Sequence, residues 1–144
     1  MIIDSQSLFS DAQAVTAAAA STNYIDLKVA NAQLGNGEPL YIHLNVDVAL
    51  TDTGSDSTVA VTIEQDDNSS FSSATAVQTL FTVAATAAAG TVYKAYIAPG
   101  VITERYIRLY YTPANGNLTT GSFTAAIVHT IQDDRYYPNN YTIS

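Results

Sequence analysis

The feature that most constrains this chain is a nine-residue stretch, residues 104–112, in which large side chains of two kinds alternate. A period of two places successive side chains on opposite faces of a β-strand, so the stretch predicts a strand with two unlike faces. The expected core face carries Ile107, Leu109 and Tyr111. The opposite face carries Tyr106, Arg108 and Tyr110. Two interpretations of this second face stay open: its side chains finish the outer surface of a sheet, or they bind a protein partner, because Tyr and Arg are enriched at interface hot spots.

Shorter alternating runs recur along the chain, separated by turn residues. They predict strands at residues 24–29, 40–48, 58–64, 78–84, 91–97 and 121–128. Turns rich in Gly and Pro are predicted at residues 34–39, 99–100 and 113–117, and polar loops at residues 51–57 and 66–71. The one aromatic of the last loop, Phe71, is expected to fold back on the core. The alanines at 17–20 favour a helix by propensity, but no amphipathic face accompanies them, so an extended segment is predicted there.

Seven or eight short strands with no helical pattern between them predict an all-β fold, an antiparallel β-sandwich of the jelly-roll type. A chain of 144 residues is expected to form one domain, residues 1–144, with a core large enough to fold without disulfides. Within it we expect an N-terminal arm and first strand at residues 1–20, the sandwich at residues 21–130, and a C-terminal arm at residues 131–144.

Charge narrows the range of partners. The chain has 13 acidic and 5 basic side chains, a net charge of -8, which argues against binding to nucleic acid or to anionic membranes because both require a basic surface. Only 12% of the residues are charged, so much of the surface is neutral and polar. The N-terminal residues lack the pattern of a signal peptide, and no apolar run reaches the ~20 residues that span a bilayer. A soluble protein is expected.

No set of residues predicts catalysis, a metal or a cofactor. There is no cysteine, and neither His43 nor His129 has a second ligand at a metal-binding spacing. Solvated turns with Asx-type hydrogen bonds are a better interpretation of the local carboxylates than calcium, because the EF-hand spacing is absent. Those carboxylates are Asp52, Asp56, Asp66 and Asp67. The chain is therefore predicted not to be an enzyme.

Both ends of the chain carry large side chains outside any predicted strand. They are Ile2, Ile3, Leu8 and Phe9 at one end, and Arg135, Tyr136, Tyr137 and Tyr141 at the other. Either these residues pack on their own sandwich, or they bind a neighbouring molecule, since terminal segments order only when they are held.

Several segments, in order along nearly the whole chain, resemble the Bbp16 family of capsid cement proteins of tailed bacteriophages. They are Met1-Ile2-Ile3-Asp4, Leu8-Phe9-Ser10-Asp11-Ala12-Gln13, Ser21-Thr22-Asn23, Ile25-Asp26-Leu27, Gly37-Glu38-Pro39-Leu40, Glu104-Arg105-Tyr106-Ile107-Arg108-Leu109, Ile131-Gln132-Asp133 and Tyr136-Tyr137. The resemblance implies a jelly-roll decoration protein without enzymatic activity or cofactor. It would be made in the host cytoplasm, sit on the outer capsid surface of the virion and bridge subunits of the major capsid protein.

The resemblance also implies a homo-oligomer, a dimer or a trimer, and we expect one tyrosine-bearing sheet face to form its interface. The ends, residues 1–14 and 132–141, are expected to contact the shell. The predicted capsid or subunit interface therefore comprises Ile2, Ile3, Leu8, Phe9, Tyr106, Arg108, Tyr110, Arg135, Tyr136, Tyr137 and Tyr141. Two other functions stay open: a carbohydrate-binding β-sandwich module, although such modules usually rely on Trp and this chain has none, and a component of the phage tail or baseplate.

Overall fold

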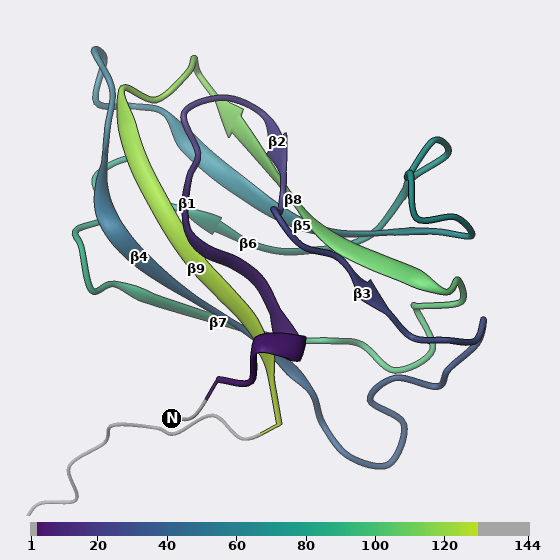
Figure 1. The fold of residues 1–144 in the computed structure, drawn as a ribbon. Helices are drawn as coiled ribbons and strands as arrows, with labels where there is room; N and C mark the ends of the chain where they lie inside the picture. The colour runs from purple at the N-terminus through teal and green to yellow at the C-terminus, as the bar shows by residue number, and fades with distance from the viewer. Residues whose placement is uncertain (1–2, 130–144) are drawn as a thin grey trace, which may run out of the picture.

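The computed structural model describes residues 3–129 and consists almost entirely of antiparallel strands (Figure 1). A single 3-10 turn, Ser5–Ser7, precedes nine strands. The strands are β1 (Leu8–Ala14), β2 (Ala19–Ala20), β3 (Ile25–Asp26), β4 (Tyr41–Thr51), β5 (Thr58–Asp66), β6 (Thr75–Val83), β7 (Val92–Tyr96), β8 (Tyr106–Ala114) and β9 (Thr120–Val128). Within residues 3–129, no helix is long and apolar enough to cross a bilayer.

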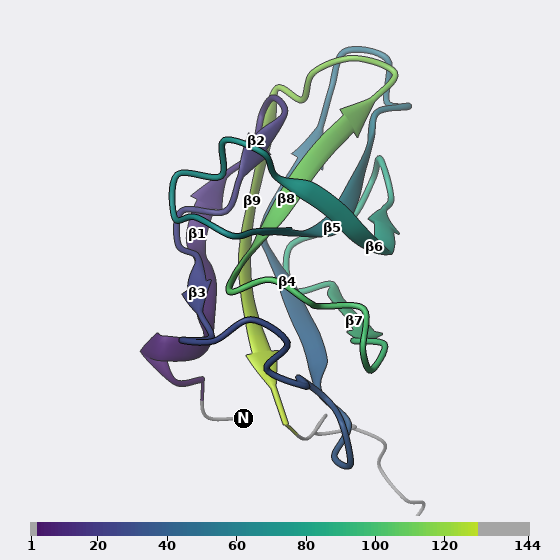
Figure 2. The same ribbon diagram turned by 90° about the vertical axis from the view of Figure 1, so that its right-hand side faces the viewer.

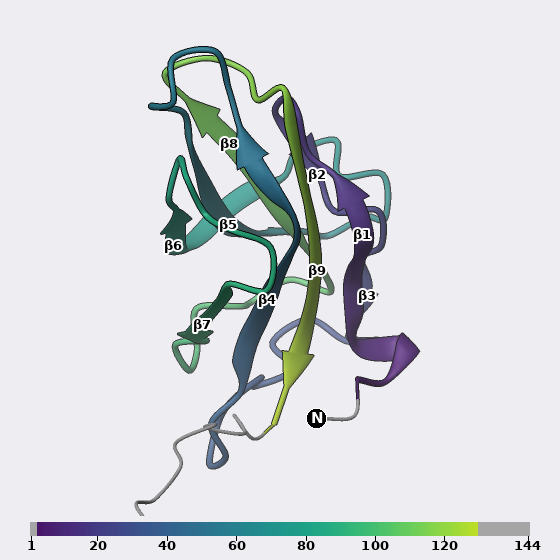
Figure 3. The same cartoon turned by 90° about the vertical axis from the view of Figure 1, so that its left-hand side faces the viewer.

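Two sheets face each other, with the strand orders β1-β9-β4-β7 and β2-β8-β5-β6, and β3 also pairs with β8 (Figures 1 and 2). The chain repeatedly crosses between the sheets, so that β1 and β9, which are distant in sequence, lie side by side (Figure 3). This order of strands is that of a jelly roll, in which two Greek keys form a double sheet. The fold class predicted from the sequence is confirmed.

The core lies between the sheets and explains the alternation in the sequence. In the five-stranded sheet, Tyr111 lies opposite Val61 and Leu109 lies opposite Ile63, and all four side chains are buried. In the four-stranded sheet, the inward side chains come mainly from β4 and β9, where Val46 lies opposite Phe123. The core side chain of Tyr111 keeps its hydroxyl satisfied by a 2.7 Å hydrogen bond with the Ser10 hydroxyl.

The prediction that residues 1–14 lack a strand to bury them is wrong for residues 8–14. These residues form β1, which pairs with β9, and Phe9 is completely buried in the core. The physical reason is that the pairing of β1 is irregular, with register shifts between Leu8 and Ser10 and between Ser10 and Gln13. Ala12 within it has a positive φ of 45°. Each irregularity interrupts the period of two, and so hides the strand from pattern analysis.

The other segments differ less from expectation. The predicted strand at residues 24–29 is only two residues long, Ile25–Asp26, because the backbone turns at Lys28 with a φ of 70°. In the alanine run, Ala19–Ala20 is a strand, which confirms the extended rather than the helical interpretation. The strand predicted at residues 40–48 continues to Thr51.

Glutamine side chains bridge the two sheets at both open sides of the sandwich. On the β6 side, the Gln78 amide donates to the carbonyl of Tyr96 at 2.8 Å and accepts from the N–H of Ala98 at 3.0 Å. Gln78 thus pairs with the edge of β7 as a peptide group would. On the other side, Gln13 donates to the carbonyl of Ala20 at 2.8 Å. Unpaired strand edges are the usual sites at which a partner adds a strand. Because these bonds occupy part of the edge on each side, we expect a partner to bind a face of a sheet and not an edge.

Candidate binding face

Most of the ion pairs and cation–π contacts among the described residues lie on or beside the outer face of the five-stranded sheet. Opposite one another on β5 and β8 lie Glu64 and Arg108, and Thr62 and Tyr110. Tyr106, Arg108 and Tyr110 alternate with buried neighbours and are themselves half-buried, so they face away from the core as the sequence predicts. Whether they bind a partner stays a prediction.

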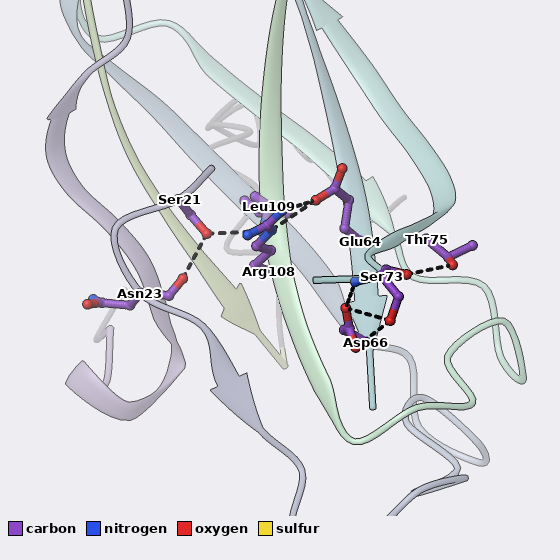
Figure 4. A network of polar contacts seen from close by, with 8 residues as sticks. All are labelled: Ser21, Asn23, Glu64, Asp66, Ser73, Thr75, Arg108 and Leu109. Carbon is purple, nitrogen blue, oxygen red and sulfur yellow. Dashed lines mark hydrogen bonds and ion pairs between the residues drawn. The ribbon is translucent and has the colours of Figure 1, made fainter. Parts of the chain in front are cut away.

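An ion pair lies at the centre of this face (Figure 4). The Arg108 guanidinium donates from Nε to Glu64 Oε2 at 2.9 Å, and its Nη2 lies 2.8 Å from the same oxygen. The side chains of Arg108 and Glu64 are only 20% and 15% exposed. The guanidinium carbon also lies 4.3 Å from the ring centre of Phe71 and 5.7 Å from that of Tyr110. Cation–π attraction and the ion pair together fix Arg108 on the surface of the sheet.

The prediction that Phe71 folds back on the core is wrong, because its ring contacts the Arg108 guanidinium on the outer face. Its backbone is in the left-handed region, with a φ of 52°, which is an uncommon conformation for a bulky residue. Such a conformation costs about 1–3 kcal/mol and persists only where surrounding contacts impose it. The loop around Phe71 therefore holds this ring outward against a local energetic preference.

Asp66 supplies the contacts that hold the loop (Figure 4). Its carboxylate, in a residue only 1% exposed, accepts from the backbone N–H of Asn68 at 3.1 Å and of Ser73 at 2.8 Å. The Ser73 hydroxyl donates to the same carboxylate at 3.2 Å. Burial alone would raise the pKa of Asp66, but the hydrogen bonds from Asn68 and Ser73 outweigh it and lower the pKa. The carboxylate is thus ionised and closes the loop from residue 66 to residue 73.

Three aromatic rings form a row beside this ion pair. The Tyr24 ring lies edge-to-face against both Phe71 and Tyr106, with ring centres 5.8 Å apart in each pair. Tyr24 is the most exposed of the three, at 48%. We call the row of Phe71, Tyr24 and Tyr106 the aromatic ridge. Edge-to-face pairs of this kind stabilise one another by about 0.5–1.5 kcal/mol.

Backbone and side-chain hydrogen bonds fix the segment that carries Tyr24 (Figure 4). The N–H of Ser21 donates to the carbonyl of Leu109 at 2.8 Å, and the N–H of Leu109 donates to the Ser21 hydroxyl at 3.0 Å. The N–H of Asn23 donates to the carbonyl of Phe9 at 2.9 Å. Tyr24 is thus anchored to both sheets and does not lie on a loose loop.

A second group of charges flanks the ridge. Arg105 donates from Nε and Nη2 to the two carboxylate oxygens of Asp26 at 2.7 and 2.8 Å, and Lys28 donates to the same carboxylate at 3.0 Å. The hydrogen bonds from Arg105 are the main cause that holds the pKa of Asp26 well below its usual range. The Arg105 guanidinium carbon also lies 4.9 Å from the ring centre of Tyr106.

In the acidic loop after β4, the Asp52 carboxylate accepts hydrogen bonds from its own loop. Asp52 accepts from the hydroxyl and the N–H of Ser57 at 2.8 and 3.2 Å, and these bonds lower its pKa. The hydrogen bonds to Asp52 and those to Asp66 confirm the prediction that aspartate side chains in these turns accept hydrogen bonds from residues of their own loops. Across residues 3–129, no group of three or more His, Cys, Asp and Glu side chains is placed to hold a metal ion.

The two histidines lie apart from the candidate binding face. His43 is on the outer face of the four-stranded sheet opposite Lys94, and burial, with a smaller contribution from Lys94, lowers its pKa. His129 follows β9, and its Nε2 lies 2.8 Å from Glu38 Oε1.

The structure separates the other predicted interface residues. Phe9 is in the core and so is not a surface residue, which corrects that prediction. Ile3 and Leu8 are half-buried. Five predicted residues lie outside the described part of the chain: Ile2, Arg135, Tyr136, Tyr137 and Tyr141.

Sequence analysis missed Tyr24 and Phe71 as members of the candidate binding face. Both come from loops or strand ends, where no period indicates the direction of a side chain. The only signal concerns Phe71, a single large aromatic in the polar segment from Asp66 to Ser73, and that pattern favours a core contact.

The fold and the face together define a class: a jelly-roll β-sandwich with a structured aromatic surface. More specifically, residues 9–127 match the family model of Bbp16, and the chain belongs to this family. A comparison with curated proteins finds no match.

Proposed function

We propose that this protein is a capsid cement protein that binds the outside of an icosahedral phage shell and bridges subunits of the major capsid protein. The observation that carries the proposal is the family match over residues 9–127, which includes seven of the nine strands in full, all but Leu8 of β1 and all but Val128 of β9. The resemblance of the sequence to capsid cement proteins supplies the function.

The physical properties of the described residues support a structural role. The hydrogen bonds of Gln13 and Gln78 join the two sheets at both open sides of the sandwich. A protein that binds the assembled lattice, and not its free subunits, stabilises the lattice by mass action. Because many copies bind one shell, weak individual contacts add up to substantial stabilisation.

The structure changes which N-terminal residues are expected to contact the shell. Since residues 8–14 belong to the sandwich, a contact from the N-terminal end is now proposed only for residues 1–7. The contact from residues 132–141 stays a prediction, as does a symmetric homo-oligomer, dimer or trimer.

A carbohydrate-binding role has less support. Sugar rings stack on flat aromatic surfaces, whereas Tyr24 is inclined by 62° to Phe71 and by 77° to Tyr106. The ridge therefore presents ring edges and one exposed ring, and not a flat platform.

The test uses shells assembled from the major capsid protein encoded in the same genome. We expect the protein to sediment with assembled shells, to be absent from the pellet when only free capsid subunits are present, and to raise the temperature at which the shells disassemble. Sedimentation with neither form, or an unchanged disassembly temperature at full occupancy, would contradict the proposal.

A variant that lacks residues 132–144 tests the C-terminal contact. We expect it to keep its Tm within a few degrees and to lose shell binding. Full occupancy of shells by the truncated protein would contradict this part of the proposal, and so would its unfolding.

A further inference from the structure

We propose that the aromatic ridge is a further contact with the capsid protein, made in addition to that of the C-terminal residues, and that it takes an uncharged, apolar segment of that partner. This inference rests on the proposed function and specifies the chemistry of the binding surface. The alternative surface is the outer face of the four-stranded sheet, where Tyr41 and Tyr96 also form an edge-to-face pair.

The ridge offers exposed aromatic area that is already ordered. Tyr24 exposes 48% of its surface, yet its segment is hydrogen-bonded to Leu109 of one sheet and to Phe9 of the other. A side chain that is fixed before binding loses little conformational entropy when a partner covers it. Ordered tyrosines at the centre of a patch are the typical hot spots of protein interfaces.

The conformation of Phe71 supports the same assignment independently. Its left-handed backbone places the ring between Tyr24 and the Arg108 guanidinium. A local conformation this unfavourable, held by the buried Asp66 carboxylate, is a feature that clusters at binding sites.

The charges around the ridge indicate the chemistry of the partner. Arg108 is paired with Glu64, and Arg105 and Lys28 are both paired with Asp26. Each arginine already has its preferred acceptor, so a charged partner group would have to displace an existing bond. An apolar segment, by contrast, gains from covering Tyr24 and leaves these pairs intact.

Arg108 acts here as a positioning residue. Its guanidinium packs against the rings of Phe71 and Tyr110, and its side chain is mostly buried. Arg108 therefore holds Phe71 in place and is not the part of the ridge that a partner would cover.

The experiment measures binding of the full-length protein to assembled shells, with Tyr24→Ala and a matched control, Tyr96→Ala. Both tyrosines are comparably exposed, 48% and 41%, and each lies in edge-to-face contact with another ring, but they belong to opposite faces. We expect Tyr24→Ala to weaken binding about 30-fold, as at a hot spot, and Tyr96→Ala to change it less than about threefold. The reverse pattern, or equal effects, would overturn the inference.

Two further measurements test the chemistry and guard against misfolding. Tyr24→Phe should bind like the unmodified protein and Tyr24→Asp should not, with the Tm of each variant measured alongside; binding by Tyr24→Asp would overturn the inference. Raising the salt from about 0.1 to about 1 M, which shortens the Debye length from about 10 to about 3 Å, should change affinity less than about threefold. A much larger loss would show that charge pairs carry the binding, and would overturn the apolar assignment.

The outcomes separate the two proposals. If the unmodified protein binds shells but Tyr24→Ala binds equally well, the cement function stands and the ridge assignment falls. If the unmodified protein does not bind shells at all, both fall. Tyr24-dependent binding to an array of glycans, without binding to shells, would replace both with a carbohydrate-binding role.

Discussion

Replacing Phe9 with alanine tests the largest difference between sequence and structure, the place of residues 8–14 in the sheet. Phe9 lies in β1 and is completely buried, among the largest buried side chains of the core. If these residues were an arm on the surface, truncating this side chain would have little effect on stability. If they form β1 as described, the substitution leaves a cavity between the sheets.

The expected magnitude follows from that burial. Truncation of a buried Phe to Ala costs about 3–5 kcal/mol, through lost transfer free energy and the cavity left behind. This is a large part of the roughly 5–15 kcal/mol that stabilises a typical domain. At about 2–4 °C per kcal/mol for a domain of this size, the Tm should fall by about 6–20 °C.

The assay is thermal unfolding followed by circular dichroism, with Asp11→Ala as the matched control. Asp11 is in the same strand but exposed, so its replacement should change stability by no more than about 0.5 kcal/mol. A Tm for Phe9→Ala within 2–3 °C (roughly 1 kcal/mol) of the unmodified protein would refute the placement of β1, and would restore the surface arm as the better interpretation.

Three smaller predictions follow from the hydrogen bonds. Tyr111→Phe removes the buried hydroxyl bonded to Ser10, and chemical denaturation should show that the free energy of unfolding falls by about 0.5–1.5 kcal/mol. Because burial raises the pKa of Tyr111 to about 12, the variant and the unmodified protein should show equal tyrosinate absorbance up to about pH 10.5. Asp66→Asn should lower the Tm at pH 7, because folding lowers the pKa of Asp66 and the ionised carboxylate therefore stabilises the fold above its unfolded pKa. Protonation removes this stabilisation, so the difference in Tm between the variant and the unmodified protein should shrink as the pH falls from about 4 toward 2. EDTA should leave the Tm unchanged, because the carboxylates of Asp52 and Asp66 accept hydrogen bonds from their own loops; a fall of many degrees would instead indicate bound calcium.

The long strands were predictable because each has one buried and one outer face. β4, β5 and β8 alternate strictly over five or more residues, and the structure places their apolar positions in the core. An antiparallel sandwich follows from such strands without further information. The pairing of β1 with β9 was not predictable in this way, because the bulges in β1 break its period and because partners distant in sequence leave no local signal.

The candidate binding face was predictable only where a strand carries it. The alternation of β8 correctly places Tyr106, Arg108 and Tyr110 outside the core. It could not show that Glu64 lies opposite Arg108, since that depends on the register between β5 and β8. Nor could it place Tyr24, whose direction is set by hydrogen bonds of its segment to two different sheets.

Phe71 shows why a residue whose position the sequence pattern does not predict is informative about function. A sequence folds reliably when local preferences and tertiary contacts agree, and places where they conflict are expected at functional sites. An aromatic in a polar loop is expected to turn inward, because burial stabilises it by about 1.5–3 kcal/mol. In this protein the Asp66 carboxylate and the Arg108 guanidinium instead hold Phe71 outside, at a φ of 52°. Phe71 is half-buried by Tyr24 and Arg108 in this position, and it supports the exposed ring of Tyr24, which is the part of the ridge that a partner would cover.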